Sequence, residues 1–138
     1  MPWDRSTTAA AALGLSGQGA ERILAWSLER FAAERLVLAS SFGPEDVVLL
    51  DVFGELGRFP RVVTLDTGRL PQETQDVIER ARRRWGLRVE CRFPDAEEAS
   101  ELVARHGPNP FYESVELRRL CCDVRKVRPL RRALTGCD

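Results

Sequence analysis

The stretch LVLASSFGPEDVVLL, residues 36–50, decides the fold class. The short apolar run at 35–40 predicts a buried strand, and Gly43-Pro44 ends it. Proline suits the first position of a helix, and the apolar residues that follow continue as a helix toward Gly54. This stretch therefore predicts a strand, a tight turn and a helix, in that order.

The same unit recurs along the chain. Residues 61–65 predict a second strand that leads into a helix over 71–85, and residues 87–93 predict a third strand followed by a helix from Pro94 through Val103. Strands that alternate with helices indicate a parallel sheet with right-handed crossovers. The sequence thus predicts an α/β fold of three layers with a parallel sheet.

Helical segments are also predicted before and after these units. One helix is expected over 20–33, and residues 114–134 predict two helical pieces, with Ser114 as N-cap and Pro129 at their junction. We expect residues 1–19 to be a flexible N-terminal tail and residues 20–138 to form a single domain.

Charge and composition exclude several functions. The 21 acidic and 21 basic residues balance, so no global field would attract nucleic acid or an anionic membrane. The apolar run near the N-terminus is too short and too often interrupted to be a secretory or membrane segment. We expect a cytoplasmic protein whose four cysteines are reduced thiols or metal ligands.

Two turns are candidates for ligand binding, because ligands of open α/β sheets bind beyond the carboxyl ends of the strands. The turn at 40–43 offers two hydroxyls, a glycine and free amides at a helix N-terminus, which suit a phosphate or sulfate oxygen. Glu45 and Asp46 would repel such an anion unless they point away. The turn at 66–68 would close the other side of the crevice, although both turns are equally explained as ordinary capped turns.

The adjacent pair Cys121-Cys122 is the most distinctive local feature. Neighbouring α-carbons lie about 3.8 Å apart, below the roughly 4.4–6.8 Å usual for a disulfide, so a mutual disulfide would be strained. The surrounding arginines and Lys126 would compensate thiolates around a metal cluster. Alternatively, Cys121 fills the core face and Cys122 is incidental, and strand alternation predicts that Cys91 is a core residue.

Three segments, in this order, resemble the adenylyl-sulfate and phosphoadenylyl-sulfate reductase family. They are LVLASSFGPEDVVLL, then VVTLDTGRLPQET at 62–74, and FYESVELRRLCCDVRKVRPLRRAL at 111–134. The resemblance implies an adenine-nucleotide α-hydrolase-like (Rossmann-like) fold, cut short at its C-terminal side. It also implies reduction of adenylyl sulfate to sulfite and AMP in sulfate assimilation, with thioredoxin or a similar thiol as donor.

The resemblance also assigns roles to residues. Two groups would bind the nucleotide, namely Ser40, Ser41, Phe42 and Gly43 in one turn and Leu65, Asp66, Thr67 and Gly68 at the other. Cys121 and Cys122 would be two of the four ligands of a [4Fe-4S] cluster, and Lys126 would lie between cluster and substrate. The family also allows a homo-oligomer.

The chain departs from the family pattern because it stops at Asp138, before a second cysteine pair and a nucleophilic C-terminal cysteine. We therefore expect these 138 residues alone to be inactive. An adenine-nucleotide-binding module, or half of a split enzyme, is the alternative. An ATP pyrophosphatase fits less well, because residues 41–46 lack the second glycine and the final serine of an SGGxDS loop.

Overall fold

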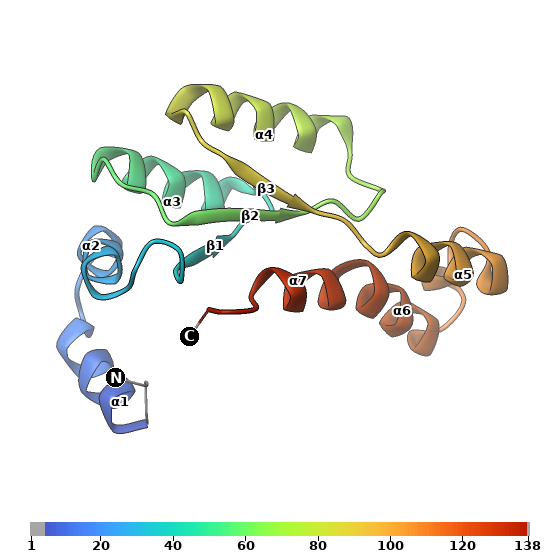
Figure 1. Ribbon diagram of the computed structural model, residues 1–138, viewed down its shortest axis with the longest axis horizontal. Coiled ribbons are helices and arrows are strands. Elements are labelled where there is room, and N and C mark those ends of the chain that lie inside the picture. The colour runs from blue at the N-terminus through green and yellow to red at the C-terminus, as the bar shows by residue number, and fades with distance from the viewer. Residues whose placement is uncertain (1–4, 138) are drawn as a thin grey trace.

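A parallel three-stranded sheet forms the centre of the molecule in the computed structural model, which describes residues 5–137. The strands β1 (Val37–Ala39), β2 (Arg61–Leu65) and β3 (Val89–Arg92) lie side by side in chain order. Figure 1 shows helices α3 (Pro44–Glu55) and α4 (Gln72–Trp85) on one face of the sheet and α7 (Arg128–Ala133) on the other. The predicted three-layer α/β fold is confirmed.

The remaining elements extend the molecule at both ends of the sheet, with α5 beyond the carboxyl ends of the strands (Figure 1). They are α1 (Arg5–Leu15), α2 (Ala20–Arg30), α5 (Ala96–His106), the 3-10 turn η1 (Pro110–Tyr112), α6 (Val115–Cys122) and the π-helical segment η2 (Asp123–Val127). In the segment where we expected a flexible tail, residues 5–15 are helical, as their alanines favour. No side chain of α1 is buried. None of the described helices is long and apolar enough to span a bilayer.

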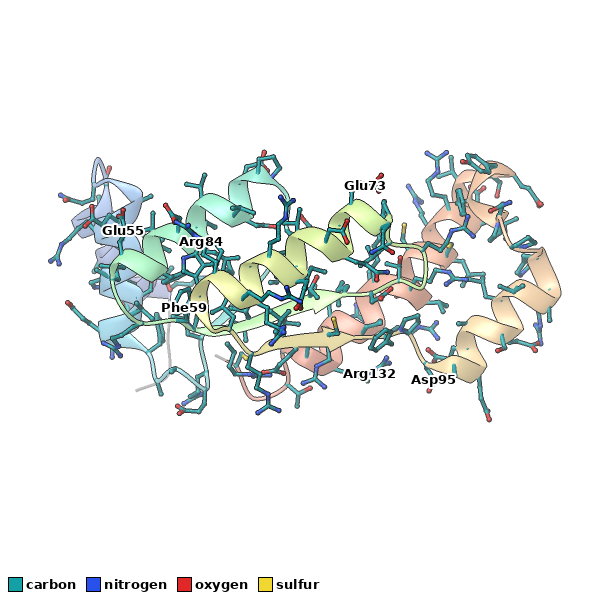
Figure 2. The ribbon with its side chains drawn as sticks, turned by 90° about the horizontal axis from the view of Figure 1, so that it is seen from above. Glu55, Phe59, Glu73, Arg84, Asp95 and Arg132 are labelled. Atoms are coloured by element: carbon teal, nitrogen blue, oxygen red, sulfur yellow. The ribbon has the colours of Figure 1, made fainter. Side chains whose placement is uncertain are left out.

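The main core lies between the sheet and helices α3 and α4. Phe42, Leu50, Val62, Ala81 and Leu87 are its buried residues. The two helices pack closely, because a Cβ added at Gly54 would lie only 2.7 Å from Nε1 of Trp85. Figure 2 shows α3 and α4 together on this face, with Arg84 at the α4 end that approaches α3. The Nη2 of Arg84 lies 3.1 Å from Oδ1 of Asp51 on α3.

The irregular turn in the last helical region begins earlier than the sequence predicts. We expected the junction at Pro129, whereas the helix widens into η2 at Asp123 and Pro129 lies in the first turn of α7. A proline inside a regular helix removes a hydrogen bond and clashes with the preceding turn, and the wider π turn just before it accommodates both problems. The predicted cap is confirmed, since the hydroxyl oxygen of Ser114 accepts a hydrogen bond from the amide of Leu117 (3.1 Å).

Cys91 does not belong to the core, contrary to the prediction from strand alternation. It lies on β3 and is exposed, because β3 is an edge strand and the helices do not cover it there. Partial desolvation, and secondly the negative charge of Asp66, raise the pKa of this thiol. Alternation correctly assigned Cys91 to one face of the sheet but could not show that this face is open at its edge.

Candidate functional site

A cavity of about 460 Å³ lies where β1 and β2 end, and we call it the crevice. It is lined by Ala39, Ser40, Ser41, Val63, Thr64, Leu65, Thr67, Arg69, Leu70, Lys126 and Leu130. Three elements that are distant in sequence thus meet at the carboxyl ends of parallel strands, where ligands of such sheets bind. Of the predicted nucleotide-binding residues, Ser40, Ser41, Leu65 and Thr67 line the crevice, whereas Phe42, Gly43, Asp66 and Gly68 do not.

The first turn, residues 40–43, satisfies its own amides. The amide of Ser40 donates to the carbonyl of Val63 (2.8 Å), that of Phe42 to Oγ of Ser40 (3.0 Å), and that of Gly43 weakly to Oγ of Ser41 (3.4 Å). The amide of Ser41 donates to Oδ2 of Asp46 (2.7 Å), and its hydroxyl donates to the same oxygen (2.9 Å). The amides of residues 40–43 are therefore already occupied.

Phe42 anchors the first turn in the core. Its φ of 59° lies in the left-handed region that glycine favours, which costs a phenylalanine about 1–2 kcal/mol. Phe42 is 5% exposed, and its ring packs with the core residues under α3 and α4. Burial of such a ring stabilises the fold by about 1.5–3 kcal/mol. Phe42 therefore fixes the backbone at the crevice while its own side chain lies on the other side of the turn.

The second turn, residues 66–69, is held by side chains from elsewhere in the chain. Only one of its contacts is local, between the amide of Gly68 and Oδ1 of Asp66 (2.9 Å). The guanidinium of Arg125 donates to the carbonyl of Thr67 (2.8 Å), so η2 holds the turn from outside. Gly68, with φ of 74°, supplies the left-handed backbone that brings the chain around.

Arg69 ties the second turn to the segment after α5. Its guanidinium donates to the carbonyl of Pro108 (2.9 Å) and to Oδ1 of Asn109 (2.8 Å) and lies 5.1 Å from the ring centroid of Phe111. Arg69 was not among the predicted site residues, and its only sequence signal is its place directly after Asp66-Thr67-Gly68. Among residues 5–137 its guanidinium makes no ion pair, so its charge is available to an anion in the crevice.

A second cavity of about 340 Å³, which we call the thiol pocket, adjoins the crevice. It is lined by Thr67, Arg69, Phe111, Arg118, Cys121, Cys122, Arg125 and Lys126. Thr67, Arg69 and Lys126 line both cavities, so Lys126 stands between the cysteine pair and the strand ends. None of the lining residues of the thiol pocket is acidic, and the pocket suits negatively charged groups.

The two cysteines of the pair lie in the same pocket without further candidate metal ligands among the described residues. Cys121 is 7% exposed and packs against Leu102 and Val124, while Cys122 is exposed, yet both thiols line the same pocket. Two sulfurs suit part of an iron–sulfur cluster, which takes four thiolate ligands. Between residues 5 and 137, no three His, Cys, Asp or Glu side chains are grouped so that they could hold a metal ion.

Cys137 lies away from both cavities. Nη1 of Arg61 donates to its sulfur over 3.8 Å, and Arg61 begins β2, whereas the crevice lies where that strand ends. Neither Cys91 nor Cys137 lines the thiol pocket. Among the described residues, the crevice itself has no cysteine in its lining.

Residues 35–138 match the family model of the phosphoadenosine phosphosulfate reductase domain. The chain is 45% identical over 104 residues to the adenosine 5'-phosphosulfate reductase of Allochromatium vinosum, an alignment that covers 75% of this chain and 40% of that protein. It is 44% identical over 110 residues to 5'-adenylylsulfate reductase 3, chloroplastic, of Arabidopsis thaliana, covering 80% of this chain and 23% of the relative. The chain thus spans two fifths or less of the length of these relatives.

The fold has a counterpart among solved structures. The phosphate complex of phosphoadenylyl-sulfate reductase from Candida auris superposes with a TM-score of 0.78, covering 98% of this chain and 64% of that one. The sequence identity is 19%, and the similarity therefore shows a shared fold only.

Proposed function

The chain belongs to the phosphoadenosine phosphosulfate reductase domain family, and from this we propose that it is the nucleotide-binding part of a reductase of adenylyl sulfate in sulfate assimilation. The observation that carries the proposal is the shared wall of the two cavities. Lys126 and Arg69 line both the crevice and the thiol pocket, so an adenylate in the crevice can direct its anionic group toward the cysteine pair.

The role of each wall follows from its chemistry. The side chains of Val63, Leu65 and Leu130 offer apolar contacts to a base or ribose, while Ser40, Ser41 and Thr67 supply polar atoms. The ammonium of Lys126 makes no hydrogen bond or ion pair with any residue in the described part of the chain, and it is free to pair with a phosphate or sulfate oxygen. Lys126 thus orients the sulfate and stabilises its charge.

We propose that Cys121 and Cys122 supply two of the four ligands of a [4Fe-4S] cluster in the thiol pocket. The basic lining supports this, because Arg118, Arg125 and Lys126 would offset the negative charge of thiolates and inorganic sulfide. When bound, such a cluster would supply a polarising charge beside the sulfate. The other two ligands would come from outside the residues described.

In the reaction we propose, a thiolate attacks the sulfur of adenylyl sulfate, the bond from sulfur to the bridging oxygen breaks, and AMP leaves with the electron pair. A dithiol such as thioredoxin then reduces the resulting thiosulfonate, releasing sulfite. Because no cysteine of the described residues lines the crevice, we propose that this chain alone releases no sulfite. All four cysteines are free thiols, as a reducing cytoplasm would keep them.

Titration calorimetry tests the binding function. We expect the purified chain to bind both adenylyl sulfate and AMP, one molecule per chain. Lys126→Ala should lower the affinity for adenylyl sulfate about tenfold through loss of a charged contact. Arg131→Ala removes an exposed arginine of α7 that lines neither cavity, and it is the matched control. Absence of heat with both nucleotides would overturn the proposal.

The alternative is a nucleotide-binding module, or one half of a split enzyme, with no catalysis of its own. The crevice has no cysteine among the described residues, and this fits the alternative as well as it fits the main proposal. A sulfite assay with adenylyl sulfate and reduced thioredoxin tests whether the chain alone is active, which neither the main proposal nor this alternative expects. Sulfite production by the chain alone would refute the inactivity proposed here.

A further inference from the structure

The lining of the crevice contains two cations and no acidic residue, whereas two carboxylates lie beside its first turn. The cations are Arg69 and Lys126, and neither is paired with a carboxylate in the described structure. Residues 40 and 41 of the first turn also line the crevice, and Glu45 and Asp46 follow in the first turn of α3, where Asp46 contacts Ser41. A crevice with this polarity favours one orientation of a ligand that has a neutral end and an anionic end.

Asp46 occupies the place that an anion would take at the first turn. Its Oδ2 accepts both the amide (2.7 Å) and the hydroxyl (2.9 Å) of Ser41, which are the donors that a phosphate oxygen would use. Glu45 adds a second carboxylate, because a Cβ added at Gly43 would lie 3.3 Å from its Oε2. Pro44 offers no amide at the first helical position.

We infer that Asp46 is a specificity-determining residue that closes the first turn to a second anionic group. The protein's own carboxylate satisfies both donors of Ser41, so the anion site of the crevice is at its two cations, Lys126 and Arg69. An adenylate with one short anionic tail fits that site. A triphosphate, whose longer tail carries more charge, has no second set of donors and is repelled by Glu45 and Asp46. The inference rests on the proposed adenylate binding.

Replacement of Asp46 tests the inference directly. In Asp46→Ser the donors of Ser41 become free and one negative charge disappears. We expect the wild-type chain to bind AMP at least about tenfold more tightly than ATP, and Asp46→Ser to bind ATP about tenfold more tightly than wild type, with AMP changed less than about threefold. Titration calorimetry in the absence of divalent metal ions measures all four affinities.

Two further variants separate the causes. Asp51→Ser makes the same substitution on the same helix, where the carboxylate pairs with Arg84 away from the crevice, and it should leave the ratio of AMP to ATP affinity unchanged. Asp46→Asn removes the charge but keeps an oxygen that can accept from Ser41, and it should raise ATP affinity less than the serine variant. Asp46→Asn also decides the question by the same ratio if Asp46→Ser does not fold.

The outcomes are distinct. Equal binding of AMP and ATP to wild type, or an unchanged ratio in a folded Asp46 variant, overturns the inference and leaves the proposed function intact. A rise in ATP affinity that Asp51→Ser reproduces also overturns it, because net charge alone would then explain the change. Absence of binding of AMP, adenylyl sulfate and ATP alike refutes the proposed function itself, and the inference with it.

Discussion

The first and second turns have similar sequences but are stabilised in different ways. Both follow a parallel strand, both contain hydroxyl residues and glycine, and both border the crevice. Each turn begins with one backbone hydrogen bond to the neighbouring strand, from Ser40 to Val63 and from Asp66 to Arg92. Beyond that bond, the first turn is closed by residues within a few positions and fixed by the buried ring of Phe42. The second is held by Arg125, which lies 58 positions away from Thr67, and by contacts of Arg69 with residues 39 and 40 positions away.

This difference predicts that the two turns respond differently to substitutions that remove a stabilising contact. A turn built into the core should fail only when the core fails, whereas a turn held by surface guanidinium groups should open by itself. The crevice therefore has one rigid wall and one wall whose position depends on the packing of the last third of the chain. The following experiments test that contrast, from the largest expected effect to the smallest.

Phe42→Ala should produce the largest effect. Removing this ring leaves a cavity between the sheet, α3 and α4, and alanine keeps the strained backbone, so we expect the free energy of unfolding to fall by about 3–5 kcal/mol. Urea denaturation followed by circular dichroism measures the change. Phe93→Ala is the control, because that ring is 58% exposed and its loss should cost less than about 0.5 kcal/mol. Equal losses in the two variants would show that the first turn is not anchored as described.

Arg125→Ala should loosen the second turn alone. The lost hydrogen bond joins a charged guanidinium to the carbonyl of Thr67 and is half-buried. We therefore expect the free energy of local opening of the second turn to fall by about 1.5–3 kcal/mol. Hydrogen exchange should become faster at residues 66–69 and stay unchanged at 40–43. The exposed Arg131 provides the control through Arg131→Ala. Faster exchange at both turns would contradict the separation between them.

Ser114→Ala should weaken the helix that carries the cysteine pair. Loss of the cap on the amide of Leu117 should cost about 1 kcal/mol. Cys121, which is nearly buried, should then react faster with a thiol reagent than in the parent chain. Ser114→Asp keeps a capping oxygen and should restore the parent rate. Persistently fast labelling in Ser114→Asp would point to a cause other than the cap.

Acid should weaken the contact between β3 and β2, the strand that leads into the second turn. The hydrogen bond and charge of Arg61, with help from Arg92, lower the pKa of Glu90 from its ordinary 4.5 to about 2. A lowered pKa in the folded state stabilises the protein fully above pH 4.5, and this contribution is lost as the pH falls from 4.5 toward 2. Because the ion pair of Arg61 and Glu90 is partly exposed, we expect the free energy of unfolding to fall by about 1 kcal/mol on acidification.

The measurement is the denaturation midpoint between pH 6 and pH 2.5, values chosen to span roughly the titration of this carboxyl. Glu90→Gln should be less stable at neutral pH and should lose less stability on acidification than the parent. Glu113→Gln, at an exposed position, should follow the parent curve. Parallel curves for Glu90→Gln and the parent would rule out a stabilising role for this carboxylate.

Local patterns in the sequence were sufficient for most of the fold. The strand predicted at 61–65 coincides with β2, and the helices predicted at 71–85 and from Pro44 differ from α4 and α3 by a residue or so. These elements have apolar periodicity and proline or glycine at their ends, which act within a few residues. The N-cap at Ser114 was predictable for the same reason.

Features that depend on distant contacts were not predictable. Alternation could not reveal that β3 is an edge strand, which leaves Cys91 exposed. The contact of Asp46 with Ser41 is local, yet the sequence left open whether residues 40–46 bind an anion or repel it, and the structure shows that Asp46 accepts hydrogen bonds from Ser41. The contacts of Arg69 and Arg125 cross the fold, and sequence spacing carries no signal for them.

The π-helical segment η2 has a consequence for how this region tolerates change in length. A π turn holds one residue more than an α-helical turn, and it behaves as a single-residue insertion in an otherwise regular helix from Val115 to Ala133. Because the wider turn absorbs the extra residue locally, deleting one residue between Asp123 and Val127 would restore the regular hydrogen bonding and leave the cysteine pair at about the same angle relative to α7. The thiols would then keep their direction while the helix itself became more regular, so η2 is a segment of this helix that tolerates the loss of one residue.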